Sequence, residues 1–222
     1  MKNRIALIHT TPLVLGPVQS ALEPYNQDYD FFHMLDEAVL FRMMKDGNTP
    51  ELTVPWLQAL VDRCIKGEAK AIIVSCSSLS PSVVSVQKNS SIPIVRIDEK
   101  MFDSVLSHSN NPVVLMTNPT NKTPAALLGE EMRVRLDLNH SVPIKVCPGA
   151  FETLMKGDVQ GHDTAVVEYI IELLKEHDDI LLSQISMARV RDLLPQDLQS
   201  SVHVSLDYTG KLLEEITEHI KS

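Results

Sequence analysis

The sequence has 222 residues with a formal net charge of −9, and it contains 44% hydrophobic and 22% charged residues. This is the composition of an ordinary globular protein, long enough for one large domain or two modest ones. The negative charge argues against nucleic acid or an anionic membrane as partner, and no apolar run approaches the roughly eighteen residues of a membrane-spanning helix. Three cysteines without close pairs make no disulfide framework, so a reducing, cytoplasmic location is expected.

The first half of the chain alternates short apolar runs with helical patterns. Strands are predicted for residues 4–9, 71–74 and 92–97. The first of these apolar runs is too short for a signal peptide and is therefore interpreted as a strand. Helices are predicted for residues 54–66, 81–88 and 99–108. The stretch 25–48 mixes aromatic and charged residues and predicts only a loop with a short helix.

The second half repeats this alternation. Strands are predicted at residues 113–116, 142–146, 180–182 and 202–206. Helices are predicted to begin at Thr123-Pro124, to cover residues 164–175, and to end the chain over residues 208–220. The pattern of both halves predicts an α/β fold with parallel sheets flanked by helices.

Landmarks at the strand ends recur at offsets of 107 to 109 residues. The corresponding pairs are Thr10 with Thr117, Cys76 with Gln184, and Asp98 with Asp207. A nearly constant offset of this size indicates a duplicated α/β unit, and the period is too long for a solenoid repeat. We therefore expect two pseudo-symmetric domains, residues 1–98 plus 207–222 and residues 99–206. Because ligands bind at the carboxyl ends of parallel strands, the active-site cleft is expected between them.

The stretch from Ala71 to Pro81 is the strongest candidate for chemistry. A short strand ends in Cys76, after which Ser80 is a predicted N-cap and Pro81 a predicted first helical residue. A helix N-terminus favours an anion, either the thiolate itself or a bound carboxylate. A buried structural cysteine is the alternative, since free cysteine is among the most buried residue types.

Three segments together resemble the aspartate/glutamate racemase superfamily. They are Val74-Ser75-Cys76-Ser77-Ser78, Leu115-Met116-Thr117-Asn118-Pro119-Thr120 and Leu182-Ser183-Gln184-Ile185-Ser186-Met187. The resemblance covers nearly the whole chain and implies two α/β domains with the active site between them. It also implies one cysteine in each half, acting on opposite faces of the substrate α-carbon. Cys76 matches the first cysteine, whereas Gln184 stands at the second position and cannot act as an acid or base near neutral pH.

The resemblance extends to further site residues. With Cys76 as the catalytic residue, the expected substrate-binding residues are His9, Thr10, Ser77, Ser78, Thr117, Asn118, Thr120, Gln184 and Ser186. Capping of helices is the alternative for the hydroxyl residues, and a loop position for His9. Cys64 and Cys147 are predicted to be structural. No histidine pair has zinc-site spacing and no phosphate-binding glycine loop occurs, so neither a metal nor a cofactor is expected.

The expected partner is a small carboxylic or amino acid, and the resemblance allows a homodimer. One hypothesis is an isomerase or decarboxylase in which Cys76 protonates a carbanion from a single face. A second is racemisation with Cys76 on one face and His9 or water on the other. The third is a ligand-binding member of the superfamily without catalysis.

Overall fold

The computed structural model describes residues 2–139 and 141–221, which form two compact units. Within the described residues, one unit runs to Glu99 and resumes at Tyr208, and the other is Lys100–Asp207. The expected domain ends at residues 1 and 222 lie outside the described residues. None of the described helices is both long and apolar enough to cross a membrane.

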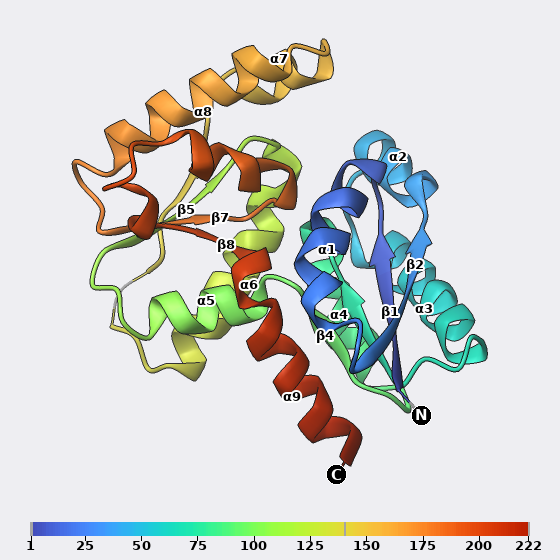
Figure 1. The fold of residues 1–222 in the computed structure, drawn as a ribbon. Helices are drawn as coiled ribbons and strands as arrows, with labels where there is room; N and C mark the ends of the chain where they lie inside the picture. Colours follow the sequence, from blue (N-terminus) through green and yellow to red (C-terminus); the bar gives the residue numbers. More distant parts are fainter. Residues whose placement is uncertain (1, 140, 222) are drawn as a thin grey trace. The chain divides into compact units, whose positions relative to one another are not determined.

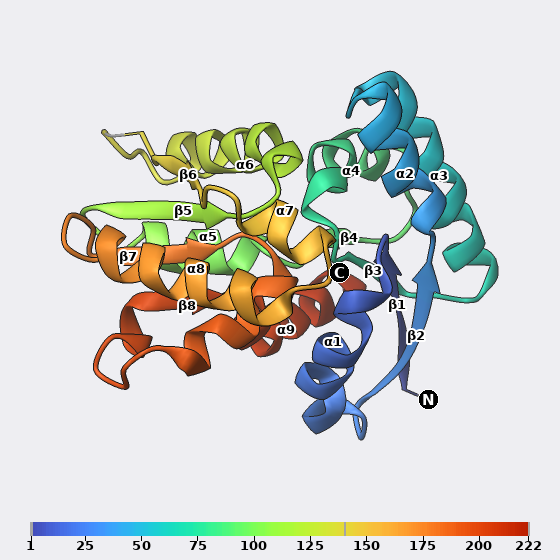
Figure 2. The same cartoon turned by 90° about the horizontal axis from the view of Figure 1, so that it is seen from above.

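The first unit is built on a parallel sheet with the strand order β2-β1-β3-β4. Its strands are β1 (Asn3–His9), β2 (Tyr29–Leu35), β3 (Ala71–Val74) and β4 (Ile94–Arg96). Its α-helices are α1 (Leu15–Leu22), α2 (Glu37–Asp46), α3 (Pro50–Lys66), α4 (Ser80–Gln87) and α9 (Thr209–Lys221). Figures 1 and 2 show α1 on the opposite side of this sheet from α2 and α3.

The core of the first unit lies between the sheet and the helices α2, α3 and α4. Alternate residues of the two central strands, such as Ile8 and Ile72, pack there against Val39, Leu57 and Val83. β3 is buried on both faces, as its continuous apolar run predicts for a central parallel strand. The position at which β3 ends, immediately before Ser75 and Cys76, is therefore fixed by packing.

The second unit has a parallel sheet in the order β6-β5-β7-β8. Its strands are β5 (Pro112–Met116), β6 (Ile144–Val146), β7 (Asp179–Leu182) and β8 (Val202–Val204). Its α-helices are α5 (Glu99–Leu106), α6 (Lys122–Arg135), α7 (Ala150–Met155) and α8 (Val159–Leu173). A 3-10 helix, η5 (Ile185–Leu193), follows β7, and Figure 1 shows α8 and α5 on opposite sides of the sheet.

The predicted fold class is confirmed, because both units are parallel α/β sheets flanked by helices. The strand orders correspond element by element when β1 to β4 are matched with β5 to β8. In each unit the first strand in the chain lies between the second and the third. The duplication that the strand-end landmarks predict is thus present in the topology.

Several local predictions need correction. The helix predicted for residues 164–175 is α8, which begins at Val159 after the N-cap residue Asp158. The stretch 25–48 contains the edge strand β2 as well as the helix α2, and α3 begins at Pro50, a favoured first helical residue, rather than at residue 54. Ser80 is not an N-cap: it is the first residue of α4, after a 3-10 helix over Ser77–Leu79, and its buried hydroxyl has no hydrogen-bond partner.

Candidate active site

Cys76 lies in the first unit where β3 ends. Its backbone is extended, with φ −97° and ψ 107°, and it is the N-cap residue of the 3-10 helix Ser77–Leu79. The Thr10 hydroxyl, at the end of the neighbouring strand β1, donates to Cys76 Sγ at 2.9 Å. The Leu79 N–H donates to the Cys76 carbonyl at 3.0 Å, and hydrogen bonding from Ser78 and Leu79 also favours the thiolate. The half-buried thiol therefore lies in a cradle of donors.

These surroundings act on the Cys76 pKa in opposite directions. Burial is the larger influence and raises the pKa of the thiol, because a low-dielectric site disfavours the thiolate. The donors from Thr10, Leu79 and Ser78 lower the pKa, because each hydrogen bond favours the charged form. The cradle is thus arranged to hold a sulfur anion once it forms, although burial keeps the resting thiol protonated.

His9 belongs to a hydrogen-bonded chain beneath this cradle. Its Nδ1 lies 2.6 Å from Ser75 Oγ, whose hydroxyl donates to the Ile8 carbonyl at 3.1 Å. Its Nε2 lies 2.9 Å from Nδ1 of His33 on β2. Burial, and then the charge of His33, lower the pKa of His9 to about 4. His9 is fully buried, so direct contact with a substrate would require one of these bonds to break.

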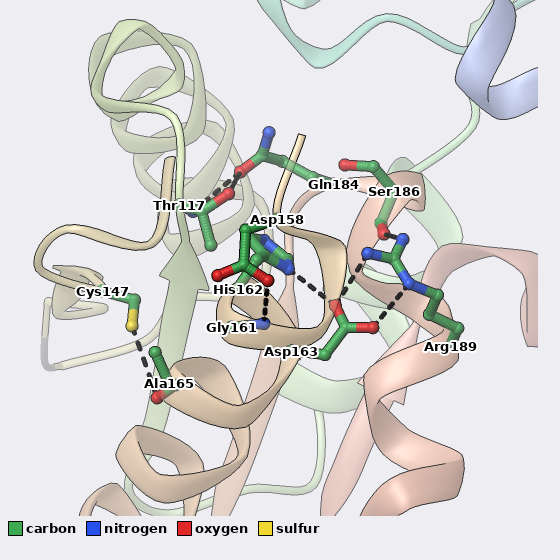
Figure 3. Close-up of polar contacts among 10 residues, drawn as sticks. All are labelled: Thr117, Cys147, Asp158, Gly161, His162, Asp163, Ala165, Gln184, Ser186 and Arg189. Carbon is green, nitrogen blue, oxygen red and sulfur yellow. Dashed lines mark hydrogen bonds and ion pairs between the residues drawn. The ribbon is translucent and has the colours of Figure 1, made fainter. Parts of the chain in front are cut away.

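Gln184 occupies the corresponding place in the second unit. It follows β7 and is the N-cap residue of η5, with φ −132° and ψ 127°. Its Oε1 accepts hydrogen bonds from the Thr117 N–H at 2.8 Å, the Thr117 hydroxyl at 3.2 Å and the Asn118 N–H at 3.1 Å. Because backbone N–H groups only donate, the amide oxygen must face them. Figure 3 shows the amide nitrogen pointing away from Thr117.

The two half-sites use the same hydrogen-bond frame. A threonine at the end of the first strand donates to the N-cap side chain after the third strand, Thr10 to Cys76 and Thr117 to Gln184. A serine just before each N-cap residue donates to the first strand: Ser75 to the Ile8 carbonyl, and Ser183 to the Leu115 carbonyl at 3.4 Å. The difference between the halves is chemical, a thiol in one and an amide in the other.

The remaining expected site residues divide into two kinds. Ser77 and Ser186 are half-buried near the two N-cap positions. Thr120 is exposed, and its N–H and hydroxyl both donate to Asn118 Oδ1, at 3.0 and 2.9 Å, so it stabilises the turn after β5. Asn118 caps the 3-10 helix that follows β5. For Asn118 and Thr120 the observed contacts are therefore capping contacts, the alternative to substrate binding.

The other two cysteines belong to the hydrophobic cores, as predicted. Cys64 is fully buried on α3, and Cys147 is buried with its Sγ donating to the Ala165 carbonyl at 3.7 Å. Burial raises the pKa of each to about 11. Across residues 2–139 and 141–221, no three His, Cys, Asp or Glu side chains come together in a way that could hold a metal ion.

Sequence reasoning missed several residues that support the site. Asn48 donates from the loop between α2 and α3 to the Ser78 carbonyl at 2.8 Å, and His33 contacts His9 from the overlooked strand β2. Asp163 on α8 pairs with Arg189 on η5 (Figure 3). These residues lack a local sequence signal because their partners are 24 to 30 positions away.

The fold and the site together are those of a duplicated α/β protein. Its two units have matching strand orders, and their polar side chains lie at the ends of matching strands. The chain belongs to the Asp/Glu/hydantoin racemase family, whose profile matches residues 18–208. No curated protein matches the sequence significantly.

Solved structures with the same fold share little sequence with this chain. A glutamate racemase from Bacillus anthracis has a TM-score of 0.75 at 16% identity, covering 98% of this chain and 82% of its own. The Picrophilus torridus aspartate racemase has a TM-score of 0.72 at 11% identity, covering 97% and 94%. A Francisella tularensis glutamate racemase in complex with D-glutamate has a TM-score of 0.69 at 18% identity, covering 98% and 81%.

Proposed function

We propose that this protein is an enzyme acting at the carbon next to the carboxylate of a small amino or carboxylic acid, as a racemase, isomerase or decarboxylase. Family membership supports the reaction class, and the related structures are named as glutamate and aspartate racemases. The observation that carries the proposal is the Cys76 sulfur held in its donor cradle, with the Thr10 hydroxyl at 2.9 Å.

Cys76 is the proposed acid and base. A thiolate Sγ takes the α-proton, so that an S–H bond forms while the C–H electron pair stays on the α-carbon and spreads into the adjacent carboxylate. Return of a proton by the same thiol gives exchange with retention, whereas racemisation requires a second donor, His9 or water, on the opposite face. In a decarboxylase the carbanion arises by loss of CO₂ instead, and the Cys76 thiol protonates it. Removing the proton first requires deprotonation of a thiol whose pKa burial raises, and the Thr10, Ser78 and Leu79 donors offset part of that cost.

Gln184 is the proposed binding group for a substrate oxygen. Its Oε1 is held by the Thr117 and Asn118 donors, which leaves the two hydrogens on Nε2 to donate elsewhere. An amide neither gains nor loses a proton near neutral pH, so it would stabilise a carboxylate or enolate oxygen without exchanging protons. Ser77, Ser78 and Ser186 are the further proposed contacts to substrate.

The test is solvent exchange at the α-carbon. The protein is incubated in D₂O with both enantiomers of aspartate, glutamate and related acids, and loss of the α-proton signal is followed by NMR. The unmodified protein is expected to exchange one of these substrates, Cys76→Ala to lose exchange, and the matched variant Cys147→Ala to keep it. Equal exchange by Cys76→Ala would contradict the proposed role of the thiol.

The configuration of the exchanged product separates the possible reactions. Deuterium in both enantiomers indicates racemisation with a second donor, exchange with retention indicates a single face, and CO₂ release indicates decarboxylation. Thermal stabilisation by a carboxylic acid without any exchange or CO₂ release would overturn the proposal in favour of a non-catalytic binding protein.

A further inference from the structure

A cluster of one buried histidine, one buried carboxylate and the partly exposed Arg189 lies next to the Gln184 half-site in the second unit. His162 and Asp163, in the first turns of α8, are 0% and 8% exposed. The Asp163 carboxylate accepts from Arg189 Nε at 2.8 Å, from Arg189 Nη2 at 2.7 Å and from His162 Nδ1 at 2.6 Å. A carboxylate is buried at this depth only when such partners replace water, and the two parallel bonds to arginine also fix its orientation.

Arg189 connects this cluster to the turn that begins at Gln184. It lies on η5, and its remaining nitrogen, Nη1, donates to the Ser186 carbonyl. One planar guanidinium therefore joins α8 to the backbone two residues beyond Gln184. In Figure 3, Gln184 and Ser186 lie above Asp163 and Arg189 in the view, and the Arg189 guanidinium contacts both Asp163 and Ser186.

The η5 turn needs support of this kind. It is a 3-10 helix of nine residues, whereas such helices are seldom longer than about four because their hydrogen bonds are poorly aligned. Its N-cap side chain adds no capping bond, since Gln184 is turned toward Thr117 and Asn118 instead. The direction of the first turn of η5 therefore depends on contacts from outside the helix.

We propose that Asp163 and Arg189 are positioning residues for the substrate-binding half-site formed by Gln184 and Ser186. The pair holds the Ser186 carbonyl, and thereby the first turn of η5, so that Gln184 Oε1 stays on its donors and Nε2 stays directed outward. His162 contributes by fixing the carboxylate through Nδ1–H. The inference rests on the proposed function for its importance to substrate binding, but the positioning itself is measurable without any substrate.

The experiment measures hydrogen exchange of the Thr117 and Asn118 amides by NMR in the free protein, because both donate to Gln184 Oε1. In Arg189→Gln their protection is expected to fall about tenfold, the equivalent of one hydrogen bond. Arg189→Lys is expected to behave alike, because lysine keeps the charge but loses the fork that joins Asp163 to Ser186. Gln184→Ala sets the level at which both bonds are absent.

Arg191→Gln is the matched control, because Arg191 lies on the same helix and pairs with Asp207 rather than with Asp163. It is expected to leave the Thr117 and Asn118 amides protected. Amides within β5, such as those of Val114 and Leu115, report the stability of the whole unit. Unchanged protection of Thr117 and Asn118 in both Arg189 variants would overturn the proposal, as would an equal fall across β5.

A second readout links the positioning to catalysis. If an acid is turned over, the Arg189 variants are expected to raise KM while the pH dependence attributable to Cys76 stays in place. A fall in kcat with KM unchanged would count against a positioning role in binding. Absence of turnover by the unmodified protein would contradict the proposed function, while the amide protection would still decide the positioning.

Discussion

The stability of the first unit is expected to fall as the pH drops from 7.5 to 5 because of His9. Burial lowers the pKa of His9 from 6.5 to about 4, with the charge of His33 as a second cause. Between these two values the unfolded chain binds a proton that the folded protein excludes. The contribution of His9 to stability is therefore fully present well above pH 6.5, is lost as the pH falls from 6.5 to about 4, and changes no further below that value.

The size of the effect follows from the two pKa values. At pH 5 His9 is almost fully protonated in the unfolded state but remains mostly neutral in the folded protein. This difference lowers the free energy of unfolding by about 2 kcal/mol relative to pH 7.5. The pKa of His33 is also lowered by burial, so its contribution has the same sign. The expected change is a large part of the roughly 5–15 kcal/mol by which most domains are stable.

Urea unfolding followed by tryptophan fluorescence measures this directly. The single tryptophan, Trp56, lies on α3, packs against the first unit's core and donates its ring N–H to Asp36 at 3.0 Å. Its emission therefore reports the unfolding of this unit. The variant His9→Asn retains an N–H donor for Ser75 but no longer titrates. It is expected to be less stable at pH 7.5. Between pH 7.5 and 5 its free energy of unfolding is expected to fall by about 2 kcal/mol less than that of the unmodified protein.

The exposed His219, on α9 of the same unit, provides the control. The variant His219→Asn is expected to keep the full pH dependence. If His9→Asn retained the same dependence as the unmodified protein, the buried His9 would not be its source and the reasoning would be refuted.

Three further predictions concern the thiols and the amide. Thr10→Val removes one hydroxyl donor to the sulfur and is expected to raise the pKa of Cys76, measured as the pH dependence of its alkylation; an unchanged profile would contradict the role of this donor. In the folded protein iodoacetamide is expected to label Cys76 alone, because Cys64 and Cys147 are buried whereas Cys76 is partly exposed, and mass spectrometry of the labelled peptides checks this. Gln184→Cys places a thiol beside the donors that Oε1 occupies and is expected to increase the fraction of product with inverted configuration, measured by chiral chromatography, whereas Gln184→Ser is expected not to do so.

The sequence was sufficient to predict the duplicated α/β architecture because central parallel strands are buried on both faces. Runs such as Ala71–Val74 and Val113–Met116 are continuous and apolar, and their spacing repeats. The edge strand β2 was missed because its residues alternate only weakly: Phe31 and Phe32 are adjacent and partly exposed, and a charged residue precedes them. Its pairing with β1 is a long-range contact that no local periodicity encodes.

The candidate site residues that carry a signal in the sequence are those that follow a strand end. Cys76 and Gln184 fall at matching positions, so sequence alone paired them. The capping by Ser80 was wrong because the chain inserts a 3-10 turn between β3 and α4, which leaves Cys76 as the N-cap residue instead. The Arg189–Asp163 pair joins residues 26 positions apart, and among many charged residues nothing in the sequence distinguishes it.

The shared hydrogen-bond frame limits which residues position 184 can accept. The N–H groups of Thr117 and Asn118 and the Thr117 hydroxyl converge on one oxygen, and the Thr117 and Asn118 residues are almost completely buried. An apolar residue there would leave these donors without a partner, at about 1–3 kcal/mol for each buried group. Glutamine satisfies the frame with a neutral acceptor and adds an N–H₂ group that a thiolate lacks. The second half of the duplication therefore has the same hydrogen-bond geometry as the first, but its side chain at this position cannot exchange protons near neutral pH.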